Sequence, residues 1–254
     1  MQKFDKTALV TGGARRIGAA IAEDLAENGF AVAIHCNRST AEAHALAARI
    51  NGRGGNAIVL SADLTEMSQA ERVVDKAAAA LGPVRLLVNN ASIFREDTPA
   101  EPDFALWDRH FAVHVKAPAL LTARLAAQLP DGADGLVVNM IDQRVWKLTP
   151  GYFSYTLSKS ALWTATRTLA QAFAPRVRVN AVGPGPAVAS ERQSPADFQA
   201  QLDGLIMQRG PELGEFGATI RYLWEARSVT GQMIALDGGQ HLAWQTPDVT
   251  GIVE

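Results

Sequence analysis

The chain has 254 residues, of which 48% are hydrophobic and 20% are charged, with a formal net charge of -2 at pH 7. This size suits one α/β domain with a large core, and the charge gives no reason to expect a nucleic-acid or membrane-surface partner. The single cysteine, Cys36, excludes an internal disulfide and fits a reducing compartment. We see no signal peptide and no apolar run of about 18 residues, and therefore expect a cytoplasmic protein.

β-rich runs alternate with helical patterns along the whole chain. The patterns predict strands at 8–10, 31–35, 57–60, 86–88, 136–140, 177–182 and 233–236. They predict helices at 17–28, 41–50, 68–81, 103–129 (bent near Pro118), 152–173, 195–207 and 213–226. This alternation predicts right-handed βαβ units, and so a single α/β domain over 1–254: a doubly wound parallel sheet of about seven strands with helices on both faces. The Pro- and Ser-containing segment 185–210 follows a strand and is expected to cover a ligand.

A glycine-rich turn at 11–18 lies between the first strand and the first helix. Gly12 and Gly18 permit a tight turn, and the helix that opens near Ile17 offers free N–H groups to a pyrophosphate. Arg16 stands in this turn. It is expected to contact the phosphates and the substrate, and the alternative is a solvated residue at the helix start.

The end of the second strand indicates which cofactor binds. An acidic residue about 20 positions after the glycines usually holds the ribose of NAD, and the sequence 35–40 contains no Asp or Glu. Asn37, Arg38 and Ser39 instead offer a guanidinium and a hydroxyl to a 2′-phosphate. We therefore expect NADPH/NADP+ over NADH, although Ser39 is also a candidate N-cap for the next helix.

Tyr155 and Lys159 are four residues apart and share one face of a predicted helix. An ammonium beside a phenol is expected to lower the pKa of Tyr155, which could then exchange a proton with a carbonyl or an imine near neutral pH. A tyrosine and a lysine at this spacing are common in proteins, and by themselves they indicate little. Its place after the fifth strand, in a chain that opens with a dinucleotide-binding turn, favours catalysis over a chance surface pair.

The motifs 11–18, 89–91, 155–159 and 184–185 follow one another in the order and spacing of the short-chain dehydrogenases/reductases, which the chain resembles over nearly its whole length. The resemblance implies a Rossmann-like fold, hydride transfer with a nicotinamide, and usually a homotetramer. It also implies that Tyr155 donates the proton and that Lys159 holds the nicotinamide ribose. The expected cofactor-binding set is Gly12, Arg16, Ile17, Gly18, Asn37, Arg38, Ser39, Asp63, Leu64, Asn89, Ala91, Ser92, Tyr155, Lys159, Pro184 and Gly185.

Four positions depart from the usual family pattern. Asp142 replaces the serine thirteen residues before the tyrosine. Arg16 and Ser92 replace glycines, and His114 replaces an asparagine. Three of the four, Arg16, Asp142 and Ser92, resemble the pteridine reductases, and the His114-Val115 pair is similar to the dihydromonapterin (dihydropteridine) reductases.

This branch implies a pterin substrate, namely a dihydropterin or dihydrofolate. Phe94, shortly after the Asn-Asn-Ala-Ser turn, would stack on the pterin ring. Asp142 and Tyr155 would deliver a proton to a ring nitrogen after hydride reaches the adjacent carbon. The expected catalytic residues are Asp142, Tyr155 and Lys159. The expected substrate residues are Arg16, Phe94, Asp142, Trp146 and Tyr155.

Purely structural roles remain alternatives for several of these residues. Asp142 could be an exposed turn carboxylate, Phe94 a loop hydrophobe, and Trp146 either a pocket wall or part of a subunit interface. His114 is expected only to hydrogen-bond a backbone carbonyl. The other histidines, His35, His44, His110 and His241, have no evident spacing partners, so no metal site is expected.

Two other functions compete with pterin reduction. One is a short-chain carbonyl or 3-oxoacyl reductase, against which the missing serine counts. The other is a catalytically silent NADP-binding sensor, against which the presence of both Tyr155 and Lys159 counts.

Overall fold

The computed structural model describes residues 4–190, 193–246 and 249–251. In this part of the chain a parallel sheet of seven strands has the order β3-β2-β1-β4-β5-β6-β7, so the predicted doubly wound sheet is confirmed. The strand order reverses between β1 and β4, which is where ligands bind in such sheets. The strands are β1 (Thr7–Val10), β2 (Ala31–Cys36), β3 (Asn56–Ser61), β4 (Val84–Asn89), β5 (Gly135–Met140), β6 (Val177–Pro184) and β7 (Met233–Leu236).

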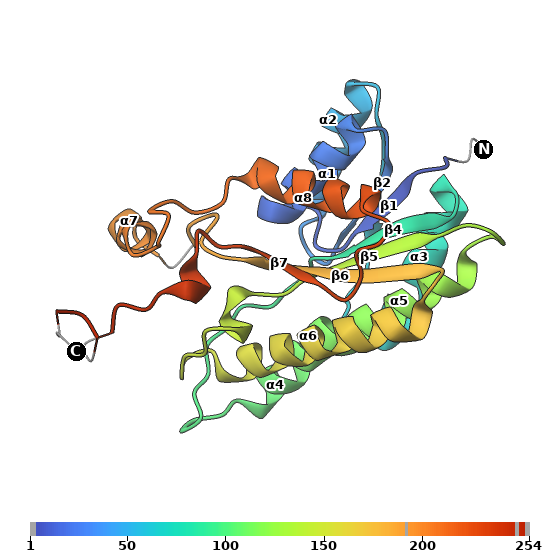
Figure 1. The fold of residues 1–254 in the computed structure, drawn as a ribbon. Coiled ribbons are helices and arrows are strands. Elements are labelled where there is room, and N and C mark those ends of the chain that lie inside the picture. Colours follow the sequence, from blue (N-terminus) through green and yellow to red (C-terminus); the bar gives the residue numbers. More distant parts are fainter. Residues whose placement is uncertain (1–3, 191–192, 247–248, 252–254) are drawn as a thin grey trace.

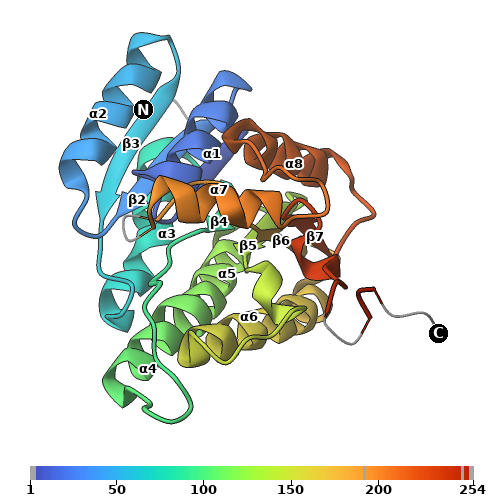
Figure 2. The same ribbon diagram turned by 90° about the vertical axis from the view of Figure 1, so that its left-hand side faces the viewer.

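Helices cover both faces of the sheet (Figure 1). One face carries α1 (Arg16–Glu27), α2 (Thr40–Gly52) and α8 (Leu213–Glu225). The other carries α3 (Met67–Leu81), α5 (Ala117–Gln128) and α6 (Phe153–Phe173), with α4 (Phe104–Phe111) beside α6. The short α7 (Pro195–Asp203) stands beyond the end of the sheet at which β6 finishes (Figures 1 and 2). Of the helices described, none combines the length and the apolar character that a membrane span requires.

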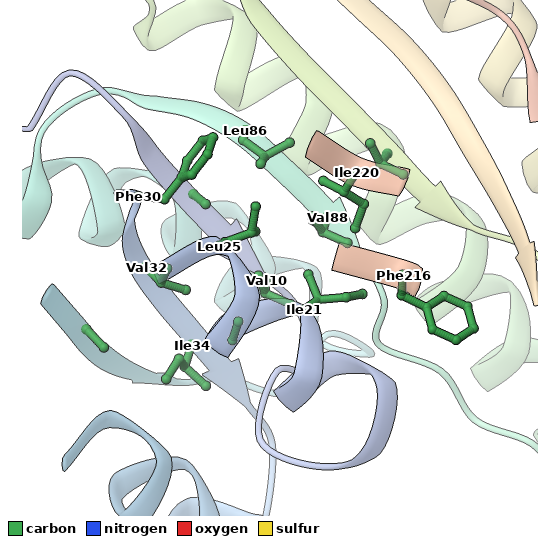
Figure 3. Packing of buried hydrophobic residues seen from close by; sticks show 14 of the residues in the cluster. Val10, Ile21, Leu25, Phe30, Val32, Ile34, Leu86, Val88, Phe216 and Ile220 are labelled. Carbon is green, nitrogen blue, oxygen red and sulfur yellow. The ribbon is translucent and has the colours of Figure 1, made fainter. Parts of the chain in front are cut away.

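The strands are apolar at consecutive positions because both of their faces are buried. In β1, Val10 belongs to the cluster under α1 and α8, whereas Leu9 belongs to the cluster under α3 and α5. Figure 3 shows the first cluster, in which strand side chains meet residues of α1 and α8. The residues labelled there are Val10, Ile21, Leu25, Phe30, Val32, Ile34, Leu86, Val88, Phe216 and Ile220.

The predicted helix at 103–129 is interrupted. A π-helical turn, Ala112–Lys116, separates α4 from α5. Pro118 lacks the N–H that a regular helix would direct to the carbonyl of His114, and the irregular turn falls just before it. The predicted helix at 195–207 was too long, because α7 ends at Asp203. The predicted helix at 152–173 begins one residue later, at Phe153. Tyr152 is the N-cap residue of α6 and has a left-handed φ of 59°.

Gly217 lets α8 pack against α1. A Cβ on Gly217 would lie 2.7 Å from Oδ1 of Asp24, the carboxylate that accepts a 2.8 Å hydrogen bond from Nε of Arg221. We expect Gly217→Ala to lower the free energy of unfolding by about 1–3 kcal/mol, because α8 must move or the ion pair must break. Urea unfolding measures this change. The matched control is Gly214→Ala on the same helix, where a Cβ meets nothing within 4 Å; it should leave stability unchanged or raise it by up to about 1 kcal/mol. Equal losses in the two variants would contradict the packing argument.

Candidate active site

The glycine turn is fastened to the ends of β2 and β4. The amide of Gly13 donates to the carbonyl of His35 at 2.9 Å, and the amide of Gly12 donates to Nδ1 of the same histidine at 3.2 Å. Gly12 has a φ of +60°, and a Cβ on Gly18 would lie 2.5 Å from Nδ2 of Asn90. Only glycine fits these two positions. The turn therefore brings backbone and the N-terminus of α1 to the switch point of the sheet, as a phosphate-binding turn requires.

His35 was not identified as part of this turn from the sequence. Its Nδ1 accepts from Gly12, and its Nε2 faces the carbonyl of Ala62 at 3.1 Å, so Nε2 carries the proton. Burial lowers the pKa of His35 to about 4, against the opposing effects of the Ala62 carbonyl and Asp63. A neutral histidine therefore holds the first turn. The position of His35 at the end of the second strand was the sequence feature that could have identified it.

Arg16 joins two segments that are far apart in sequence. Its backbone is left-handed, with a φ of 54°. Its guanidinium donates to the carbonyls of Val188 and Ala189, each at 2.9 Å. These carbonyls belong to the segment 185–210 that was expected to cover a ligand, of which 191–192 lie outside the described residues. The contacts of Arg16 with phosphate and substrate stay predictions.

The residues expected to hold the adenosine end gather at the ends of β2 and β3. Asn37 and Arg38 are exposed and Ser39 is partly exposed. Asp63 accepts hydrogen bonds from the hydroxyl of Thr65 at 2.7 Å and from Asn37. Here an exposed guanidinium stands where an acid would select NAD, so this end of the site fits a 2′-phosphate. Leu64 is buried and Ile17 packs on the core under α1.

At the nicotinamide end of the expected cofactor site, hydrogen bonds hold the backbone of Ala91 and Gly185 in place. The amide of Ala91 donates to Oγ1 of Thr11 at 3.0 Å, and that of Gly185 donates to the carbonyl of Leu236 at 2.8 Å. Asn89 donates to Asn139, while its Oδ1 is buried and has no partner in the described part of the chain. An unsatisfied buried acceptor beside the switch point fits a bound polar group. Pro184 closes β6 at the same edge of the sheet.

The structure brings the three expected catalytic residues together. The hydroxyl of Tyr155 donates to Oδ2 of Asp142 at 2.9 Å. Oδ1 of Asp142 accepts the amide of Arg144 at 2.9 Å. Nζ of Lys159 donates to the carbonyl of Met140 at 2.8 Å and lies 5.7 Å from the centre of the Tyr155 ring. Asp142 follows β5 while Tyr155 and Lys159 sit in α6, so the site forms where these two elements meet.

Burial dominates the proton equilibria of this trio. The pKa of Tyr155 lies well above its ordinary value, because the phenol is buried and Asp142 is beside it. The expectation that Lys159 would lower this pKa is wrong for this structure. Burial also raises the pKa of Asp142, although Arg144, Tyr155 and Lys159 oppose it, and lowers that of Lys159 to about 8. Tyr155 is therefore protonated at neutral pH, which is the form that can donate a proton.

His114 lies in the π-helical turn behind Tyr155. Its Nε2 accepts the amide of Ile93 at 3.2 Å, so this nitrogen carries no proton. The hydroxyl of Ser92, 2.9 Å from Nε2, must then donate to it. Nδ1 donates to Ser158, 2.8 Å away. His114 thus meets a backbone amide and not the expected carbonyl, and it fixes the direction of the Ser92 hydroxyl, which stands beside Tyr155.

His110 does have a spacing partner, so the sequence-based statement that it has none was wrong. It precedes His114 by four residues, and their rings stack with centres 5.5 Å apart. Nδ1 of His110 lies 2.8 Å from the hydroxyl of Ser154. Burial lowers the pKa of both histidines. The i, i+4 spacing was the signal that sequence reasoning missed.

Phe94 reaches the catalytic residues. Its ring stacks on Tyr152 with centres 4.4 Å apart and an interplanar angle of 2°, and it meets Tyr155 edge-on at 4.9 Å. Trp146 instead packs against Trp163 and His241, at 6.4 and 5.0 Å between ring centres. Its role as a wall of the substrate pocket stays a prediction.

Comparison with known proteins agrees with this geometry. The family model described as short chain dehydrogenase matches residues 6–198. The chain belongs to this family. Its fold matches that of FolM Alternative dihydrofolate reductase 1 from Brucella suis, solved in complex with NADP, with a TM-score of 0.94, 64% identity, and coverage of 96% of this chain and 98% of that one.

Two curated members of the short chain dehydrogenase family are also similar over most of their lengths. Pteridine reductase 1 of Leishmania tarentolae is 31% identical, and dihydromonapterin reductase of Klebsiella pneumoniae is 29% identical. In both cases the match covers 92% of this chain and 96% of the relative. The family assignment and the pterin-reductase resemblance made from the motifs are confirmed.

The buried His35 predicts a pH dependence of stability. Its folded pKa of about 4 lies below the ordinary 6.5, so between these values the unfolded chain binds more protons. The stabilisation is therefore complete above about pH 6.5 and is lost as the pH falls towards 4, at up to about 1.4 kcal/mol per pH unit.

We expect His35→Gln to be less stable at pH 7 and to lose less stability than the unmodified protein between pH 6.5 and 4.5 in urea unfolding. His44→Gln, on the exposed side of α2, is the control and should follow the unmodified protein throughout. If His35→Gln showed the same pH dependence of stability as the unmodified protein, His35 would not be the group responsible for it.

Proposed function

We propose that the protein is an NADPH-dependent reductase that transfers hydride to a reduced pterin, a dihydropterin or dihydrofolate. The observation that carries this proposal is the part-buried hydrogen bond of 2.9 Å between Tyr155 and Asp142. A carboxyl with a raised pKa can hold and pass a proton, whereas the serine usual at this position only orients a carbonyl oxygen. The relatives named for dihydrofolate, pteridine and dihydromonapterin reduction, and the neighbour in complex with NADP, support it.

Bound NADPH supplies the hydride. We propose that the turn at Gly12 and Gly18 holds its diphosphate, that Arg38 and Ser39 hold its 2′-phosphate, and that Lys159 holds the nicotinamide ribose. The glycine turn lies at the N-terminus of α1, where backbone N–H groups favour an anion. Arg38 offers a fork of donors that matches a phosphate.

The proton follows a short route. Tyr155 is protonated and donates its hydroxyl proton to the ring nitrogen beside the carbon that accepts hydride, so that a C=N bond becomes CH–NH. Asp142, which accepts the Tyr155 hydroxyl in the resting site, then takes up a proton from solvent and passes it to the Tyr155 oxygen. Burial raises the pKa of Asp142, which favours the protonated carboxyl that this step uses. Phe94, at the edge of Tyr155, offers an aromatic face to the flat pterin.

We further propose that the protein is cytoplasmic and assembles as a homotetramer. The single cysteine is a buried free thiol, which suits a reducing compartment. Along the outer side of α6, Leu157, Ala161 and Ala165 are only partly buried within one chain. Small side chains on an uncovered helix face allow close packing against another copy.

A substrate panel tests the proposed activity. Oxidation of NADPH at 340 nm is followed with dihydromonapterin, dihydrobiopterin, dihydrofolate and an acetoacetyl thioester, and each assay is repeated with NADH. We expect turnover of at least one pterin, with the higher kcat/KM for NADPH because Arg38 replaces the acid that would select NADH. Turnover of the thioester alone would overturn pterin reduction, and a higher kcat/KM with NADH would overturn the cofactor assignment.

Asp142→Asn keeps a hydrogen-bond partner for Tyr155 but cannot pass a proton as a carboxyl does, and Asp142→Ser restores the residue usual in the family. We expect both to lower kcat for the pterin by about 10²- to 10⁴-fold, the range typical of general acid catalysis, while the Kd for NADPH changes little. Steady-state kinetics and NADPH fluorescence titration measure the two effects. Unchanged turnover would remove Asp142 from the mechanism.

A further inference from the structure

Arg144 lies two residues after Asp142 and is held at the rim of the active site. Its guanidinium is 5.0 Å from the centre of the Tyr152 ring and 5.9 Å from that of Phe94. Nη1 donates to the hydroxyl of Thr149 at 3.0 Å. Two aromatic rings and one hydrogen bond therefore fix a cation beside the aromatic pair at which we place the pterin.

The charge of Arg144 is not neutralised by a salt bridge within the described residues. Its side chain contacts Thr149 and the two rings, all uncharged, and the nearby Asp142 interacts with it only through space. The loop 143–150 also contains Lys147 and no acidic residue. Glu96, on the facing loop, lies against Gly151, 3.3 Å from where a Cβ would stand. A partly exposed guanidinium in this position can accept an anion without breaking an existing ion pair.

We place the pterin ring against Phe94, with its reacting nitrogen at Tyr155. In this pose the substituent extends towards Tyr152 and Arg144, both of which contact Phe94. A neutral polyol side chain gives the guanidinium no opposite charge. A benzoyl-glutamate side chain offers carboxylates, which guanidinium binds in a two-pronged geometry, and an aromatic linker. Leu148, 71% exposed on the same loop, provides apolar surface for that linker.

We propose that Arg144 is a substrate-binding residue that recognises an anionic side chain, and that the preferred substrate class is therefore a dihydropterin with a carboxylate-bearing aryl substituent, as in dihydrofolate. This inference rests on the proposed function. It assigns the substrate class through the guanidinium of one residue, whose backbone amide separately holds Asp142.

The test compares dihydrofolate with the neutral dihydrobiopterin at saturating NADPH. Arg144→Met removes the charge but keeps a long, polarisable side chain against the rings, and Arg144→Lys keeps the charge. Lys147→Met is the matched control for lost loop charge. For Arg144→Met we expect the ratio of kcat/KM for dihydrofolate to kcat/KM for dihydrobiopterin to fall about tenfold, through KM for dihydrofolate, as loss of a charge-assisted hydrogen bond predicts. The effect of the Arg144 charge on Asp142 is common to both substrates and cancels in this ratio.

Arg144→Lys should retain part of the preference, and Lys147→Met should behave as the unmodified protein. Raising the salt concentration should increase KM for dihydrofolate only, because ions screen an exposed charge pair. Equal losses for both substrates in Arg144→Met would overturn the inference, since Arg144 would then only position Tyr152 and Phe94. The inference would also be overturned if the unmodified protein showed no preference for dihydrofolate over dihydrobiopterin. Turnover of neither pterin would instead defeat the proposed function itself.

Discussion

The hydrogen bond between Tyr155 and Asp142 is the constraint on which the proposed chemistry of this protein depends. It places a phenol and a carboxyl in an interior where charge is poorly solvated, with the ammonium of Lys159 close by. Burial raises the pKa of both acids and lowers that of Lys159 to about 8. Each polar group has a specific partner: Asp142 accepts the amide of Arg144, and Lys159 donates to the carbonyl of Met140. Such satisfied networks are what make buried polar groups tolerable.

The fold supplies this arrangement from the junction of β5 and α6. The carboxyl end of a central strand delivers Asp142 to the crevice, and the first turns of α6 deliver Tyr155 and Lys159 on one helix face. Behind them the π-helical turn brings His114 against Ser158 and Ser92, so that the tyrosine is supported from a second helix. A regular helix could not continue unchanged through this region, because Pro118 lacks the necessary N–H. The irregular turn is therefore part of the site.

The strands, the helices and the Tyr155–Lys159 pair were predictable from the sequence. The depth of burial and the contacts between distant loops were not. Strands buried on both faces read as continuous apolar runs, and the i, i+4 spacing of Tyr155 and Lys159 is a property of any helix. The direction of the Tyr155 pKa shift was missed because spacing identifies neighbours but not the depth of burial. Arg144 was missed because its partners, Phe94 and Thr149, are set by loop conformation. The contacts of Arg16 with the carbonyls after β6 likewise depend on two segments that no local pattern links.

The orientation of one hydroxyl limits how Tyr155 can act. The amide of Ile93 requires a bare Nε2 on His114, so the Ser92 hydroxyl proton is committed to that nitrogen. Asp142, and not Ser92, accepts the proton of the Tyr155 hydroxyl. If Asp142 were ionised, loss of the tyrosine proton would leave two anions side by side in a buried site. A protonated Asp142 instead supplies a replacement for that proton. Burial raises the pKa of Asp142 and so favours the protonated form, which suits the proposed role of Tyr155 as the proton donor.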